Sequence, residues 1–192
     1  MANVSRPSGY TPVKYLNGQP YTGASIKMYS TADNLFLGDL VKQAPDPVVS
    51  NNGVYQEVDR ATATTELLYG VVVGWEPNPT ALGNLYHAAS AVYGVLIAPI
   101  DNLILEAQSD DATMVQSDVG LNVDAVFTAG TTATGMSNMA LDGDTAATTA
   151  GLQFRLLRMV DRPDADNADS IAAQRFWVKC NQSAWVDQSA GV

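Results

Sequence analysis

Apolar runs rich in β-branched residues, each bounded by Gly, Pro, Asn or Asp, dominate the middle of the chain. Residues 69–74 (YGVVVG) are continuously apolar, which is typical of a strand that is buried on both faces. Residues 92–98 and 102–108 form two further apolar runs that are separated by a short turn segment. These runs predict strands at the centre of a sheet.

Shorter extended segments lie on both sides of this region. They occur at residues 13–16, 24–30, 34–42, 54–58, 153–160 and 175–181. Turn-forming dipeptides such as Asn17-Gly18 and Asn52-Gly53 precede or separate them. About nine or ten short strands with such turn signals indicate an all-β fold, either an antiparallel β-barrel or a jelly-roll-like sandwich.

One main β domain is expected over residues 12–186, because 192 residues with 46% hydrophobic content suffice for a single core. Residues 1–11 show no periodicity and predict an extended arm that is ordered only by a partner. Residues 187–192 form a C-terminal tail. Two loop excursions are expected at 78–91 and 128–151, and the second, rich in Thr, Ala and Gly, indicates a long loop or an edge hairpin.

Helix is expected to be minor. Residues 109–123 (SDDATMVQSDVGLNV) predict the one short helix, with Ser109 as its N-cap and two acidic residues in its first turn. Gly120 is expected to end it.

The formal net charge is −10, from 20 acidic and 10 basic residues. Nucleic-acid binding requires Lys and Arg against phosphates, so DNA and RNA are not expected partners. The basic residues are scattered along the sequence, apart from Arg155, Arg158 and Arg162. We expect this trio to pair with Asp161 and Asp164 as ordinary strand-surface charges.

The chain shows neither a membrane span nor a signal peptide by sequence. Its first residues lack a basic segment followed by an apolar one, and no apolar run approaches the roughly 18 residues that a span requires. A soluble protein without a membrane partner, made in the cytosol, is therefore expected.

Catalytic residue types are sparse. The chain has one His (His87) and one Cys (Cys180), it has no G-x-S-x-G motif, and no Cys/His cluster has the spacing of a zinc site. We expect His87 to be a surface or interface imidazole rather than a general base. The sequence thus predicts neither an enzyme nor a cofactor.

An acid-rich segment over residues 161–169 supplies hard oxygen ligands of the kind that calcium prefers, namely Asp161, Asp164, Asp166, Asn167 and Asp169. It lacks the central Gly and the bidentate acid at the twelfth position of an EF-hand loop. We therefore expect these residues to be solvated acids in a loop, and whether the segment binds calcium stays open.

The order of several short motifs matches a known family. They are GYTPVKYLNGxPYxG at residues 9–23, LGDLVK at 37–42, YGVVVG at 69–74, VLIAPIDNLILEAQ at 95–108, DVGLNV at 118–123 and WVKCN at 177–181. In these motifs the chain resembles the capsid cement (decoration) proteins of tailed bacteriophages. None of the motifs is catalytic, and together they extend over most of the chain.

This resemblance implies a structural virion protein on the outer surface of the icosahedral head, made in the cytoplasm of the bacterial host. It implies that the protein bridges neighbouring capsomers, with the phage major capsid protein and itself as partners. The excursions at 78–91 and 128–151 extend beyond a minimal cement domain, so a homodimer and a homotrimer both remain open. We expect the contacts to use apolar or basic residues in segments that cannot all be core: Arg6, Tyr10, Trp75, Leu82, Leu85 and Tyr86.

A carbohydrate-binding β module of a phage fibre or head appendage is the alternative. In that case Trp75 and Tyr86 would line a shallow glycan site, because sugar rings pack against aromatic faces. Core packing or an interface position is equally compatible with the sequence for Trp75, which is expected at a strand end.

Overall fold

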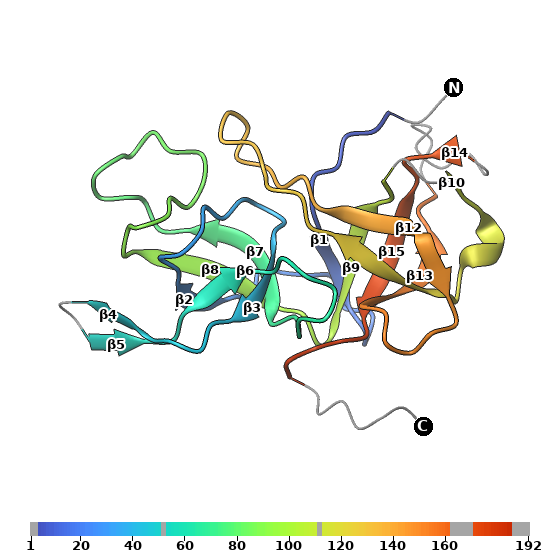
Figure 1. The fold of residues 1–192 in the computed structure, drawn as a ribbon, viewed down its shortest axis with the longest axis horizontal. Helices are drawn as coiled ribbons and strands as arrows, with labels where there is room; N and C mark the ends of the chain where they lie inside the picture. The colour runs from blue at the N-terminus through green and yellow to red at the C-terminus, as the bar shows by residue number, and fades with distance from the viewer. Residues whose placement is uncertain (1–3, 51–52, 111–112, 162–170, 186–192) are drawn as a thin grey trace.

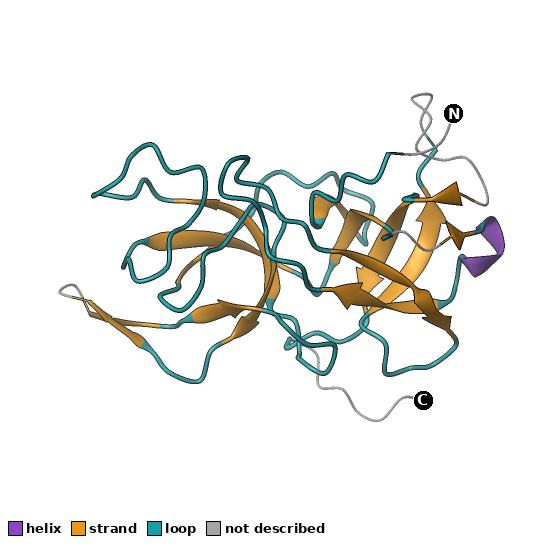
Figure 2. Cartoon of the chain, turned by 45° about the horizontal axis from the view of Figure 1, so that its top comes forward, coloured by secondary structure: helices purple, strands orange, loops and turns teal. Residues whose placement is uncertain are grey.

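The computed structural model describes residues 4–50, 53–110, 113–161 and 171–185, and it shows an all-β protein with two antiparallel sheets in a sandwich-like arrangement (Figures 1 and 2). The six-stranded sheet contains, in spatial order, β1 (Thr11–Tyr15), β9 (Leu103–Gln108), β15 (Arg175–Cys180), β13 (Phe154–Met159), β11 (Asn122–Val126) and β12 (Ala140–Ala147). The five-stranded sheet contains β2 (Ile26–Tyr29), β8 (Gly94–Pro99), β7 (Gly70–Trp75), β3 (Leu40–Gln43) and β6 (Val58–Arg60). The predicted fold class is confirmed.

Two small two-stranded sheets complete the fold. One pairs β4 (Val48–Ser50) with β5 (Gly53–Tyr55), and the other pairs β10 (Thr113–Met114) with β14 (Ile171–Ala172). The six-stranded sheet also curves, because Ser109, directly after β9, forms an isolated parallel bridge with Leu141 of β12. This bridge brings the edge strand β12 close to the end of β9 and gives that layer a barrel-like outline.

The main core lies between the two sheets. Leu105 and Phe154 of the six-stranded sheet are fully buried in one cluster with Leu40 and Val71 of the five-stranded sheet. A second cluster, which includes Leu35 and Val72, packs on the other face of the five-stranded sheet. Successive residues of β7 therefore enter different cores, which explains the continuous apolar run in the sequence.

The N-terminal arm departs from its prediction. Residues 4–10 lie against the body, where the Arg6 amide donates to Gln108 Oε1 (2.8 Å) and Gln108 Nε2 donates to the Val4 carbonyl (2.9 Å). Tyr10 then enters the core. The expectation that only a partner orders this arm is wrong for these residues, because a buried Gln and a buried Tyr hold them; residues 1–3 and the tail at 187–192 lie outside the described part.

The predicted helix over residues 109–123 is also wrong. Its described residues include the short strand β10, a single 3₁₀ turn, Gln116–Asp118, and the start of β11. Ser109 does not cap a helix, because its amide donates to the Gln174 carbonyl (2.7 Å) and its hydroxyl accepts from the Gln174 amide (3.0 Å). Pairing with the chain before β15 thus takes the groups that a helix N-terminus would use.

The tract at 128–151 is only partly a loop. Residues 128–139 form a loop, but residues 140–147 form β12, the edge strand of the six-stranded sheet. Leu141 on this strand is fully buried, so one large apolar residue ties an otherwise small-residue segment to the core.

Candidate functional site

The two loop excursions meet over the segment 34–38, and we call the surface they form together the loop platform. On one side, Leu35 and His87 exchange backbone hydrogen bonds (both 2.9 Å), and the Phe36 ring stacks on Tyr86 with centroids 5.5 Å apart. On the other side, the Leu37 amide donates to the Gly135 carbonyl (3.0 Å). The segment 34–38 therefore joins loops that are about fifty residues apart in sequence.

The platform exposes several large apolar side chains. Leu82 is 79% exposed, Leu85 is 55% exposed and Met136 is also exposed. Tyr86 is half-buried because of its stack on Phe36. Backbone hydrogen bonds at His87 and Gly135 join both loops to the segment 34–38 and so support these side chains.

The β4–β5 hairpin is a second apolar projection, and it extends from the end of the molecule that the five-stranded sheet forms (Figures 1 and 2). Val49 and Val54 face each other across its two strands, and they are 71% and 66% exposed. Its base is anchored by the buried Val48 and by Tyr55, whose ring stacks on Tyr29 at 4.3 Å. The sequence analysis identified the turn before Gly53 but not this exposed valine pair, which valines flanking an Asn-Gly turn could have suggested.

The predicted contact residues fall into different environments. Leu82, Leu85 and Tyr86 come together in the platform, whereas Arg6 is exposed on the arm beside the six-stranded sheet. Trp75 is half-buried and packs against the second core cluster.

Tyr10 requires a correction. It is fully buried, its ring stacks on Phe154 at 4.7 Å, and its hydroxyl donates to the Ala140 carbonyl (2.9 Å). Tyr10 therefore belongs to the core and is not available for contact with a capsid.

His87 is not at the surface as expected. It is fully buried, its ring stacks on Tyr93 at 4.1 Å, and its Nε2 lies 3.1 Å from the Tyr93 carbonyl. Burial lowers the pKa of His87, so the imidazole is neutral and packs as part of the platform support.

Other candidate chemistry is limited in the described part of the chain. Burial raises the pKa of the Cys180 thiol to about 12, so it stays protonated. No group of three or more His, Cys, Asp or Glu among the described residues could hold a metal ion, and no described helix has the length and apolar character to cross a bilayer. Of the acid-rich segment 161–169, only Asp161 belongs to the described part of the chain.

A basic face on the outer side of the six-stranded sheet is the feature that sequence reasoning missed. In β15, Phe176, Val178 and Cys180 point into the core, so the alternating residues face outward. The basic face consists of Lys14, Arg155, Arg158, Arg175 and Lys179, gathered around Trp177 by strand register. The sequence analysis grouped only Arg155 and Arg158 of these five; strand pairing adds Lys14, Arg175 and Lys179, which are distant from them in the sequence.

Trp177 lies at the centre of the basic face. Lys14 Nζ is 4.6 Å and the Arg158 guanidinium 4.7 Å from its ring centroid, which are cation–π distances. The indole Nε1 donates to Glu106 (3.4 Å), and Arg175 lies 3.6 Å from the same carboxylate. Because two cations already contact this ring, it is not an open platform for a sugar.

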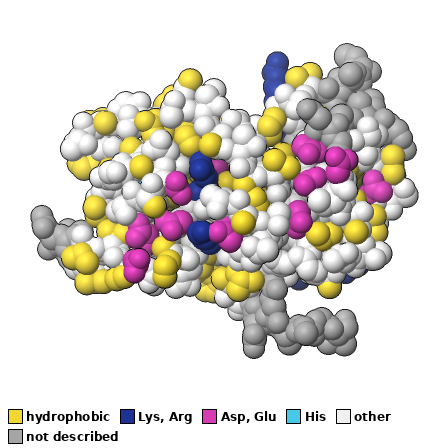
Figure 3. All heavy atoms as spheres, in the orientation of Figure 1, with side chains coloured by type: hydrophobic (Ala, Val, Ile, Leu, Met, Phe, Trp, Pro, Cys, Tyr) yellow, Lys and Arg dark blue, Asp and Glu magenta, His cyan; other side chains and the backbone are white. Residues whose placement is uncertain are grey.

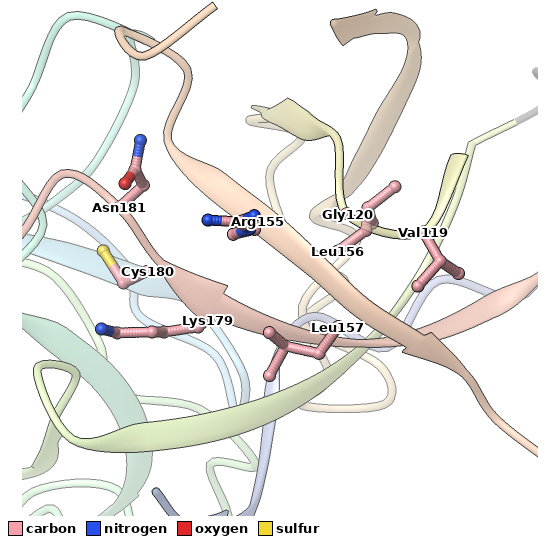
Figure 4. Close-up of a pocket in the computed structure, with 8 residues that line it drawn as sticks. All are labelled: Val119, Gly120, Arg155, Leu156, Leu157, Lys179, Cys180 and Asn181. Carbon is pink, nitrogen blue, oxygen red and sulfur yellow. The ribbon is translucent and has the colours of Figure 1, made fainter. Parts of the chain in front are cut away.

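Arg155 and Lys179 occupy directly opposite positions on β13 and β15. They line a pocket of about 500 Å³ beside Gly120 and Asn181 (Figure 4). Neither has an acidic partner in the described part of the chain, so the expected pairing of Arg155 with Asp161 is not observed; Arg162 and Asp164 lie outside that part.

Asp39 is a buried carboxyl beneath the platform. Its Oδ2 accepts the Phe36 amide (2.9 Å), yet burial raises its pKa from an ordinary 3.8 to about 6, against the lowering effects of Ser137 and Arg60. The protonated form therefore favours the folded state. This contribution to stability is fully present below pH 3.8 and is lost as the pH rises through about 6.

We expect Asp39→Asn to change the pH dependence of folding. Between pH 7 and pH 5 the wild-type protein should gain about 1 kcal/mol of unfolding free energy relative to the variant, because only the wild type takes up this proton on folding. Urea unfolding of both proteins at the two pH values measures this difference, in which the opposing effect of His87 cancels. A constant difference between the two proteins would contradict the elevated pKa.

Comparisons with protein families, with curated proteins and with solved structures gave no match.

Proposed function

We propose that this chain is a structural virion protein of the cement class, which binds the outer surface of a phage capsid and bridges neighbouring major capsid protein subunits. The observation that carries the proposal is the pair of apolar projections, the loop platform and the β4–β5 hairpin, on an ordered β body. Exposed apolar groups gathered on projections mark surfaces that bind other proteins. The order of motifs shared with cement proteins supports the same role.

The chemistry of the rest of the chain agrees with a contact function. The one His is buried and neutral and the one Cys is buried as a thiol, so neither supplies a catalytic group. A net charge of −10 suits a protein outside the shell, which does not meet the packaged DNA. We therefore propose a role without catalysis, at the outer capsid surface, with the major capsid protein and further copies of the chain as partners.

Two projections on one body also provide a means of bridging. When one projection is bound, the second is held near the shell at high effective concentration, so two modest contacts give strong combined binding. The carbohydrate-binding alternative has less support, because Tyr86 stacks on Phe36 and Trp75 packs against the core.

The proposal predicts that charges on either projection weaken capsid binding. Val49→Asp with Val54→Asp, or Leu82→Asp with Leu85→Asp, should each reduce co-sedimentation with heads that lack this protein at least tenfold, because a carboxylate cannot be desolvated cheaply in an apolar contact. Heads decorated with the wild type should also rupture at a higher temperature than bare heads.

Thr64→Asp with Thr65→Asp is the matched control, since both threonines are exposed and belong to neither projection. Thermal unfolding of each free variant shows that its fold is kept. If bare and decorated heads are equally stable, the cement role is rejected and binding to a glycan array becomes the next measurement.

A further inference from the structure

The six-stranded sheet contains two like-charge pairs of opposite sign. Arg155 on β13 is directly opposite Lys179 on β15, and Asp124 on β11 is directly opposite Asp142 on β12. Like charges in such positions destabilise a sheet. Within the described residues neither pair has an ion-pair partner of the other sign.

The acidic pair belongs to a larger group that we call the acidic edge, formed by Asp110, Asp124, Asp142 and Asp144. Burial and then repulsion from the other three carboxylates raise the pKa of Asp142. Figure 3 shows acidic side chains gathered over this part of the six-stranded sheet. Asp144 is exposed and the other three acids are half-buried, so the group is accessible to another molecule.

The basic face offers the complementary surface. Arg155 and Lys179 both line its pocket of about 500 Å³ (Figure 4), a volume that can hold carboxylate side chains. Arg and Lys both form charge-assisted hydrogen bonds with carboxylates.

We propose that the basic face of one copy binds the acidic edge of a second copy. This contact relieves both like-charge pairs, because it brings carboxylates to Arg155 and Lys179 and cations to Asp124 and Asp142. A nucleic acid would neutralise the basic face alone and would meet the repulsion of a chain with a net charge of −10. Although two copies also repel each other over long distances, salt screens such repulsion beyond about 8 Å at physiological ionic strength, whereas close pairs persist.

The proposal deepens the self-association part of the proposed function, and it does not require the capsid. Its test is therefore the oligomeric state of the purified chain, measured by sedimentation velocity over a concentration series at about 0.15 M salt. If the chain self-associates but does not bind capsids, the proposed function is rejected and the contact between copies stands.

Charge exchange gives a sharp experiment. We expect Arg155→Glu with Lys179→Glu, and separately Asp142→Lys with Asp144→Lys, to weaken self-association at least tenfold. An equimolar mixture of the two variants should associate again, because the intact basic face of one variant meets the intact acidic edge of the other and the two reversed surfaces also complement each other. In 1 M NaCl the association of the wild type should weaken.

A charge-matched control separates the local contact from net charge. Arg155→Gln with Lys179→Gln changes the net charge by two units in the acidic direction, as does Gln43→Glu with Thr65→Glu on exposed positions near the other sheet. Only the first should dissociate the protein. A monomeric wild type at all concentrations, no recovery in the mixture, or binding of duplex DNA to the basic face of a monomer would each overturn the proposal.

Discussion

Tyr10→Ala is expected to lower the free energy of unfolding by about 4 kcal/mol, the cost typical of removing a buried aromatic ring from a core. The ring is fully buried between the two sheets and stacks on Phe154. The substitution would also remove the anchor that ends the N-terminal arm. Chemical denaturation followed by tryptophan fluorescence measures the loss.

Tyr10→Phe separates the ring from its hydroxyl. Burial raises the pKa of Tyr10 well above its ordinary value, so the neutral hydroxyl donates to the Ala140 carbonyl. Loss of that bond should cost about 1 kcal/mol, as is typical of one hydrogen bond. If Tyr10→Ala were as stable as the wild type, Tyr10 would be a surface residue, as the sequence analysis had expected.

Gly135→Ala is expected to separate the two loops of the platform and to cost about 3 kcal/mol. Gly135 has a φ of +71°, and a Cβ at this position would lie 1.9 Å from the Leu85 carbonyl oxygen. Positive φ costs a non-glycine residue about 1–2 kcal/mol, and relieving the overlap adds a similar amount. Thermal unfolding and protease cleavage within residues 78–91 report the two effects.

Two glycines serve as controls for this substitution. Gly120 has a φ of +100°, but no atom lies near a Cβ added there. Gly120→Ala therefore tests backbone strain alone and should lower the free energy of unfolding by about 1 kcal/mol. Gly83→Ala has neither feature and should be nearly neutral. Equal effects at positions 135 and 120 would contradict the close approach to Leu85.

Much of the β scaffold could be predicted because strand patterns are local. The continuous apolar run at 69–74 indicates burial on both faces, and β7 indeed supplies Val71 to one core cluster and Val72 to the other. Where tertiary pairing competes with local preference, prediction failed. Ser109 has the chemistry of a helix N-cap, yet its amide and hydroxyl bond to Gln174, which is 65 residues away.

The composition determined that this chain is acidic, poor in catalytic residue types and able to form one β core. Only the tertiary structure decided where the contact surfaces lie. Tyr10 enters the core because its ring stacks on Phe154 and its hydroxyl reaches the Ala140 carbonyl, which is 130 residues away. The register of β1, β9, β15 and β13 gathers on one face cations that are up to 165 residues apart. Such groupings depend on strand order and register, which arise from packing between distant segments and leave no mark in the local sequence.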